Sequence, residues 1–300
     1  MTPPRKPTAA DFDPQVLALF DQYVHGSIDR RGFLSGAARF ATGATTAAGL
    51  LAALSPRFAA AQQVAPDDPR LSTSYRAFDS PDGYGKARGY LARPAKARSP
   101  LPVVLVIHEN RGLNPHIEDV TRRLALEDYV AFAPDALYPL GGYPGDEDKA
   151  RELFPKLDQA RTREDFLAAA AFLRGIDGGS GRLGVVGFCY GGAMTNFLAT
   201  ELPYVAAAAP FYGAAPAVEN VPKIKAELLV VLAGEDPRVN ASWPPYQAAL
   251  DQAGVTYALY QPAGTQHGFH NDTTPRYDEA AAKEAWKRTL ALFERRLRRA

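Results

Sequence analysis

The chain has one cysteine, and its neighbours are those of a reactive thiol. Cys189 stands in G-F-C-Y-G, with glycine two residues before it and two after it. A strand that turns sharply into a helix needs small residues at both positions, and the turn exposes the middle side chain beside the next N–H. A lone cysteine forms neither an intramolecular disulfide nor a multi-thiolate zinc site. Cys189 is therefore either a nucleophile or a small buried apolar residue.

An acid and a histidine follow where a catalytic triad requires them. Asp236 comes after the run L-L-V-V-L-A-G-E, and His267 lies in G-T-Q-H-G-F-H. The order nucleophile, acid, histidine is that of the α/β-hydrolases. Glu235 and His270 are the rival candidates, and a turn acid or helix N-cap would also explain Asp236. The chain order favours a triad of Cys189, Asp236 and His267.

A second carboxylate follows another apolar run. Glu109 lies in H-E-N-R-G-L-N, directly after the apolar residues 101–107. A carboxylate close to a thiol can accept its proton. The alternative is an ion pair with Arg111 at the surface.

Strand and helix patterns alternate along most of the chain and predict a mostly parallel α/β sheet with helices on both faces. No helix separates the first two strands, which predicts an antiparallel pair at one edge. The expected strands are residues 72–78, 86–92, 101–107, 129–133, 183–188, 205–210, 227–233 and 256–261. The expected helices are residues 116–127, 146–175 with a break near Pro155, 194–200, 243–253 and 277–298. Ligands bind at the carboxyl ends of parallel strands, and the candidate residues follow such strands.

The charge balance excludes one class of partner. Lys plus Arg total 34 and Asp plus Glu total 33, so the net charge is +1. A protein with this charge balance lacks the excess of basic residues that nucleic-acid-binding proteins have.

The histidines do not predict a metal site. The spacing of His108, His116, His267 and His270 fits no helical pair of metal ligands. We therefore expect no nucleic acid, metal or cofactor, and a small-molecule substrate.

The N-terminal region has the order of parts of a signal peptide. Arg30 and Arg31 precede Phe-Leu, an Ala/Gly/Leu-rich stretch spans residues 36–54, and small residues follow at 59–61. This resembles a twin-arginine export signal. The resemblance predicts a leader over residues 1–61 and a hydrolase domain over residues 62–300. It also predicts a periplasmic or otherwise exported protein, with the twin-arginine export machinery as partner. The apolar stretch is too short to predict a stable membrane span. The alternative is an internal amphipathic helix with two solvated arginines.

From about residue 72 onward the chain resembles the dienelactone hydrolase (carboxymethylenebutenolidase) family. The motifs are H-E-N-x-G at 108–112, A-P-D-x-L-Y at 133–138, G-F-C-Y-G-G at 187–192, A-G-E-D-P at 233–237 and H-G-F at 267–269. The resemblance implies an α/β-hydrolase fold with about eight strands and a Cys–His–Asp triad. It also implies cleavage of carboxylic ester or lactone bonds through an acyl-enzyme.

The same resemblance implies a role for each site residue. Glu109 removes the thiol proton when substrate binds, while His267 stabilises the thiolate and later activates water. Asp236 orients His267. The N–H groups of Tyr190 and Asn110 form the oxyanion hole.

Two positions depart from the family pattern. Members that act on dienelactone carry an arginine and a serine, which help to bind the substrate carboxylate, where this chain has Leu140 and Gly268. The departure argues against dienelactone itself and favours a less polar ester, unless Arg111 or Arg238 takes over that role. The remaining candidates for the substrate pocket are Tyr138, Tyr143, Phe211, Tyr212, Phe269 and the segment 140–145.

Two other functions stay open at the level of sequence. The same triad suits a thioesterase or an acyl transferase. A periplasmic thiol sensor would instead oxidise Cys189. The chain has no second cysteine to resolve a sulfenic acid, and a sensor has no need of Asp236.

Overall fold

The computed structural model describes residues 7–42, 45–97 and 100–298. Its centre is an eight-stranded sheet in the order β1-β2-β4-β3-β5-β6-β7-β8. The strands are β1 (Leu71–Ser80), β2 (Gly85–Pro94), β3 (Leu101–Ile107), β4 (Val130–Pro134), β5 (Gly179–Phe188), β6 (Val205–Phe211), β7 (Glu227–Val231) and β8 (Tyr257–Tyr260). From β4 to β8 all neighbours are parallel, whereas β1 pairs antiparallel with β2, and β2 with β4. The mostly parallel sheet and its antiparallel edge are confirmed.

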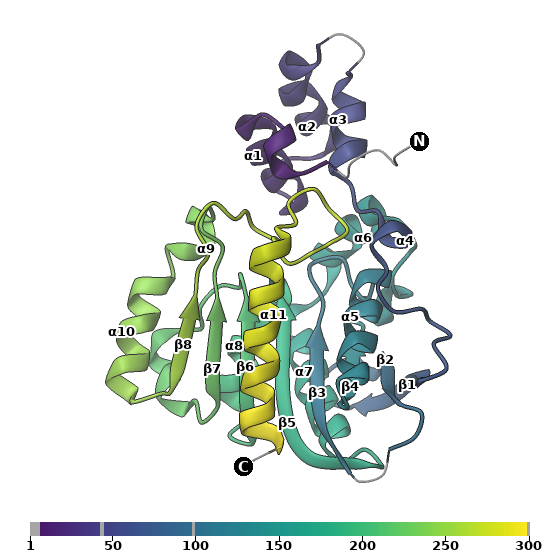
Figure 1. Ribbon diagram of the computed structural model, residues 1–300, viewed down its shortest axis with the longest axis vertical. Coiled ribbons are helices and arrows are strands. Elements are labelled where there is room, and N and C mark those ends of the chain that lie inside the picture. The colour runs from purple at the N-terminus through teal and green to yellow at the C-terminus, as the bar shows by residue number, and fades with distance from the viewer. Residues whose placement is uncertain (1–6, 43–44, 98–99, 299–300) are drawn as a thin grey trace.

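Helices cover both faces of the sheet (Figure 1). Helices α5 (Pro115–Leu126) and α11 (Glu279–Phe293) pack on one face. Helices α7 (Gln159–Arg174), α8 (Tyr190–Glu201) and α10 (Trp243–Ala253) pack on the other. Residues of β3 are almost entirely buried because both of its faces are covered. Its unbroken run of apolar side chains is what such a strand requires.

The shorter elements complete the chain. The predicted helix over residues 146–175 divides into α6 (Glu147–Leu153), a 3₁₀ turn (Phe154–Lys156) and α7. The helix predicted over residues 277–298 is α11, which ends at Phe293, and a π-helix follows it over Glu294–Arg298. The remaining short elements are α4 (Phe58–Ala61), α9 (Pro237–Asn240) and 3₁₀ turns at Ala9–Asp11, Ala38–Phe40, Tyr138–Leu140 and Val218–Lys223.

The N-terminal region forms a small helical cluster of its own. Its helices are α1 (Pro14–Val24), α2 (Arg30–Ala37) and α3 (Ala47–Leu54). Asp13 and Asp29 cap α1 and α2 by accepting hydrogen bonds from backbone N–H groups, which satisfies donors that a helix start leaves free. Apolar side chains such as Phe20, Phe33 and Leu54 bury one another between the helices.

This cluster lies over the end of the sheet toward which the arrows of β7 and β8 point (Figure 1). That is the carboxyl end of the parallel strands, where the candidate residues emerge. Among the described residues, we find no helix both long and apolar enough to cross a bilayer. The division into a leader and a mature domain stays a prediction.

Candidate active site

Cys189 occupies a strained turn between β5 and α8. Its backbone has φ 55° and ψ −110°, a left-handed conformation that side-chain-bearing residues rarely adopt. The N–H of Cys189 donates to Phe211 O at 3.0 Å. A Cβ atom on Gly191 would lie 2.2 Å from Ile107 O, and one on Gly187 would lie 2.1 Å from Gly191 O. The glycines are therefore required by close backbone contacts, and the turn has the form of a nucleophile elbow.

The predicted acid and histidine meet beside the elbow. Nδ1 of His267 lies 2.5 Å from Oδ2 of Asp236, and both side chains are buried. Burial lowers the pKa of His267, but the Cys189 thiol and the Asp236 carboxylate raise it above its ordinary value. Glu235 is exposed on the other side of the turn. His270 is buried and stacks on Phe188, so neither rival reaches the site.

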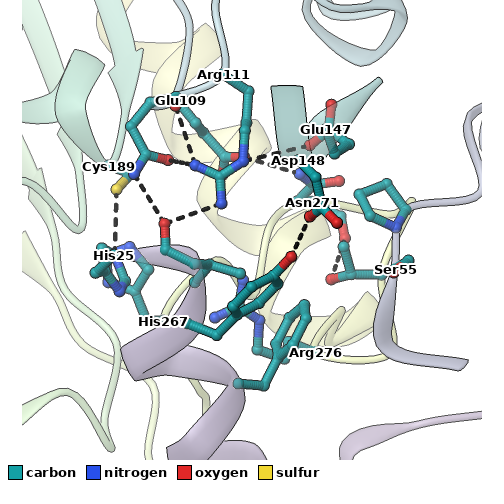
Figure 2. Close-up of a pocket in the computed structure, with 16 residues that line it drawn as sticks. His25, Ser55, Glu109, Arg111, Glu147, Asp148, Cys189, His267, Asn271 and Arg276 are labelled. Carbon is teal, nitrogen blue, oxygen red and sulfur yellow. Dashed lines mark hydrogen bonds and ion pairs between the residues drawn. The ribbon is translucent and has the colours of Figure 1, made fainter. Parts of the chain in front are cut away.

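The thiol has a hydrogen-bond partner from an unexpected part of the chain. Sγ of Cys189 lies 3.6 Å from Nε2 of His25 (Figure 2). His25 follows α1, and its ring lies edge-on to the ring of His267, with centroids 4.7 Å apart. Burial raises the pKa of the Cys189 thiol, but His267 and His25 outweigh burial and lower it to about 6. A thiol of this kind is largely thiolate at neutral pH.

The sequence reasoning missed His25, although one signal was present. Asp21 and His25 are spaced i,i+4, which places their side chains on one face of a helix. Nδ1 of His25 lies 2.8 Å from the carbonyl oxygen of Asp21 and 3.2 Å from its Oδ1. Arg238 donates from Nη2 to Nε2 of His25 at 2.9 Å.

The loop after β3 lies beside the elbow. Nε2 of His108 accepts from the N–H of Ala136 at 3.1 Å, and its Nδ1 donates to Glu109 O at 2.5 Å. Burial lowers the pKa of His108 to about 4, so it is a neutral residue that ties the loop to the end of β4. Asn110 and Tyr190 both line a cavity with Cys189. Tyr190 is the first residue of α8, and such an N–H has no acceptor within its helix.

Glu109 and Arg111 lie in the same cleft as the thiol but point to other partners (Figure 2). Oε2 of Glu109 accepts from Nδ2 of Asn271 at 3.1 Å. Arg111 does not form the surface ion pair with Glu109 that we considered as the alternative. Its Nη1 bonds Asn110, its Nη2 donates to the carbonyl oxygen of Val24 at 2.9 Å, and its Nε lies 3.8 Å from Glu147.

Two cavities open on Cys189. The first has a volume of about 60 Å³ and includes Glu109, Arg111 and Arg276, so it holds only a few water molecules. The second has a volume of about 310 Å³, which reaches the size of small-molecule sites. It is lined by His25, Gly26, Asn110, Arg151, Phe154, Pro155, Cys189, Tyr190, Ala193, Tyr212, Ala214, Arg238 and Val239. His25, Asn110 and Cys189 line both cavities, so the ring of His25 stands at the boundary between them.

Several expected pocket residues lie elsewhere. Phe269 is fully buried and packs against Tyr212, so it belongs to the core. The ring of Tyr138 lies under the guanidinium of Arg88, and Tyr143 donates to Glu147 at 2.9 Å. Neither these three residues nor segment 140–145 line the two cavities at Cys189. These positions give no support to the expected role in substrate binding, which stays a prediction.

One set of side chains could hold a soft metal ion. The ligand atoms of His25, Cys189 and His267 all lie within 4.8 Å of one another, and thiolate with imidazole suits Zn²⁺ or Cu⁺. We expected no metal here from the spacing of the other histidines. Nη2 of Arg238 lies 2.9 Å from His25 and 3.4 Å from His267. This fixed positive charge opposes a bound cation, so the set fits a metal poorly.

Comparison with known proteins identifies relatives of the sheet and of the N-terminal cluster. The model of the dienelactone hydrolase family matches residues 87–297, and a model described as YqhI-like matches residues 3–41. "Putative hydrolase fragment YghX" of Escherichia coli is 51% identical over 113 residues, which are 38% of this chain and 97% of that protein. "Putative carboxymethylenebutenolidase" of Synechocystis is 33% identical over 229 residues, covering 70% of this chain and 92% of its own. The crystal structure of a "Putative Dienelactone Hydrolase" from Klebsiella pneumoniae matches with a TM-score of 0.64 and 29% identity, covering 74% of this chain and 98% of that chain.

Proposed function

Because the chain belongs to the dienelactone hydrolase family and is a hydrolase, we propose that it cleaves carboxylic ester or lactone bonds through a Cys189 thiolate. The observation that carries this proposal is the strained position of Cys189 beside the His267–Asp236 pair. A thiolate attacks an acyl carbon more readily than a thiol does. The low pKa of Cys189, about 6, supports a thiolate at neutral pH.

The proposed reaction uses the groups around Cys189. A neighbouring imidazole holds the proton of the Cys189 thiol, the thiolate attacks the acyl carbon, and the N–H groups of Tyr190 and Asn110 stabilise the developing oxyanion. The leaving oxygen takes up that proton from the imidazole as the bond to the acyl carbon breaks. Water then gives a proton to His267 and attacks the thioester, which releases the acid. Asp236 holds the His267 ring in position for this step.

The larger cavity is the proposed substrate pocket. The smaller cavity has about a fifth of the volume of the larger one. Phe154, Tyr190 and Tyr212 give the larger cavity an aromatic lining, and Arg238 lies at its edge. This lining supports an ester or lactone of low polarity, and the Leu140 and Gly268 departures from the family pattern argue against dienelactone itself.

The test is hydrolysis of short-chain chromogenic esters, lactones and thioesters by the full chain and by Cys189→Ala. We expect turnover of at least one ester or lactone by the wild type and its loss in the variant. Turnover confined to thioesters would favour the thioesterase alternative. Equal turnover by both proteins would overturn the role of Cys189.

We propose in addition that the twin-arginine machinery exports the protein. Support comes from the sequence around Arg30 and Arg31, both of which are exposed where α2 begins. Replacing both arginines by lysine keeps their charge and removes the signal. We expect the wild type in the periplasmic fraction and the lysine variant in the cytoplasmic fraction of a bacterium that has this machinery. The same fractionation for both proteins would overturn export by this route.

A further inference from the structure

We propose that His25 is a second catalytic imidazole, which accepts the thiol proton of Cys189 in the resting enzyme, and that helices α1 to α3 are therefore part of the active site. The inference rests on the proposed function only in taking Cys189 as the nucleophile. It differs from the family resemblance, which assigns the removal of this proton to Glu109.

The position of the thiol carries the inference. Sγ of Cys189 lies 3.6 Å from Nε2 of His25. The His267 ring also lies beside the thiol, since the ligand atoms of His25, Cys189 and His267 all lie within 4.8 Å of one another, and a hydrogen bond to His267 helps to lower the pKa of the thiol. The carboxylate of Glu109 instead accepts from Asn271. In this resting arrangement, His25 lies at hydrogen-bond distance from the sulfur while Glu109 is engaged elsewhere.

His25 has the orientation that a base at this position needs. Its Nδ1 faces the carbonyl oxygen and the carboxylate of Asp21 at 2.8 and 3.2 Å. A donor hydrogen bond at Nδ1 leaves the lone pair on Nε2, the atom that faces both the thiol and Nη2 of Arg238. The pair repeats the relationship of His267 to Asp236, so two Asp–His pairs converge on one sulfur atom.

The hydrolase body holds the segment around His25 in place. The carbonyl oxygen of Val24 accepts from Nδ2 of Asn110 at 3.0 Å and from Nη2 of Arg111 at 2.9 Å. Arg111 is only 6% exposed, and a buried guanidinium that loses such an acceptor is costly. Tyr23 donates to Asp148, which also pairs with Arg30 at 2.8 Å. The segment is therefore fixed at the site through polar contacts, among them those of the buried Arg111 guanidinium.

Charged groups face His25 from several elements, and they act in opposite directions. Asp21 on α1 favours a positive imidazole, and Arg276 weakens this effect because it lies 3.4 Å from the Asp21 carboxylate. Arg238 on α9 opposes a positive imidazole because its guanidinium donates to the same Nε2 atom. The ring of His267 is close enough to add repulsion when it is protonated. A thiolate on Cys189 favours the positive form of His25.

Two imidazoles carry the protons through the whole reaction. The S–H bond of Cys189 breaks and an N–H bond forms at Nε2 of His25, which leaves a thiolate beside an imidazolium. The thiolate forms the thioester, and the leaving oxygen takes the proton from His25. Water then adds to the thioester with loss of a proton to His267, and this proton returns to the sulfur as the acid leaves.

The experiment measures the rate of Cys189 alkylation by iodoacetamide against pH in the full chain. The variants are His25→Gln, which cannot take a proton, and Cys189→Ala, which removes the thiolate that favours a positive His25. Hydrogen exchange of α1 shows whether the helix stays in place. The rate follows the thiolate whether or not any ester is a substrate, so failure of this inference is distinct from failure of the proposed function.

His25→Gln should raise the pH midpoint by at least about one unit because an opposite charge near the sulfur is lost. A residue that only fixes the N-terminal helices would change stability and leave the midpoint in place. An unchanged midpoint in His25→Gln with α1 still protected would overturn the inference. If His25→Gln loosens α1, the test is the pKa of the His25 ring followed by NMR, which should fall in Cys189→Ala because the thiolate is lost. An unchanged pKa of His25 in Cys189→Ala would overturn the inference.

Discussion

Nε2 of His25 and Sγ of Cys189 lie 3.6 Å apart, although 164 residues separate them in the sequence. The contact joins the N-terminal helices to the turn that carries the thiol. It also places His25 between a small cavity with charged walls and a larger cavity with aromatic walls. The candidate active site therefore has residues from both parts of the chain.

Asp236→Asn should reduce turnover far more than a change at the neighbouring carboxylate. Loss of the charge 2.5 Å from Nδ1 of His267 removes the group that orients the ring and stabilises its positive form. We expect kcat to fall on the order of 10²- to 10⁴-fold. Glu235→Gln is the matched control, because Glu235 is exposed one residue away, and it should stay within about twofold of the wild type. Similar losses in both variants would contradict the assignment of the triad acid.

The elbow should tolerate no side chain at Gly191. An added Cβ would lie 2.2 Å from Ile107 O, a backbone atom that cannot move away freely. We expect Gly191→Ala to lower the free energy of unfolding by about 3 kcal/mol, the upper part of the range for overpacking, as measured by urea denaturation. Gly175→Ala is the control, since its Cβ would meet nothing nearer than 3.8 Å. Equal stability of the two variants would count against the elbow geometry.

Asp135 should make stability depend on pH. Burial raises the pKa of this carboxyl to about 6, although the N–H groups of Leu113 and Leu137 and the charge of Arg88 oppose the rise. The unfolded value is about 3.9, so the folded state binds more protons between these values and loses stability as pH rises through them. Asp135→Asn removes this dependence.

The measurement for Asp135 is urea unfolding of both proteins at several pH values. We expect the free energy of unfolding of the wild type to fall relative to Asp135→Asn by roughly 2 kcal/mol between pH 4 and pH 7. A constant difference across that range would show that Asp135 titrates normally in the fold.

Asp148 should hold the N-terminal helices on the body. Its carboxylate accepts from Tyr23 and pairs with Arg30. Hydrogen bonds to a charged group contribute about 1.5 to 3 kcal/mol, so Asp148→Asn should speed hydrogen exchange in α1 roughly tenfold or more. Asp79→Asn removes only an exposed pair with Lys86 and should leave α1 unchanged. No difference between these variants would show that other contacts hold the cluster.

Cleavage of the leader bears on the role of His25. A cut near Ala61 would remove α1 to α3, and with them the contact to Cys189. We expect the intact mass of the active, exported protein to include residue 25. A mass that corresponds to a start near residue 62, with full activity, would show that the enzyme works with His267 alone.

The sequence predicted the hydrolase body well because its patterns are local. The continuous apolar run of residues 101–107 and the glycines around Cys189 reflect contacts that every strand of this kind and every elbow must make. The choice of Asp236 and His267 over Glu235 and His270 followed from chain order. In the structure Asp236 and His267 are in contact, whereas His270 stacks on Phe188.

The role of the N-terminal region and the lining of the cavities depended on how distant segments pack, which the sequence does not show. His25 lies in a segment whose arginines and small residues suggested an export signal, and only its docking shows that the ring reaches Cys189. Phe269 and Tyr143 stand near the right strands in the sequence. Burial of Phe269 in the core and the hydrogen bond of Tyr143 to Glu147 direct both away from the cavities.

Rapid quenching of the full chain during turnover of a short-chain p-nitrophenyl ester, followed by peptide mass measurement, tests the thiolate mechanism at the atom concerned. We expect the mass of one acyl group on the peptide that contains Cys189, and neither adduct nor turnover in Cys189→Ala. Turnover without any adduct on that peptide, retained in Cys189→Ala, would contradict acyl transfer through Cys189.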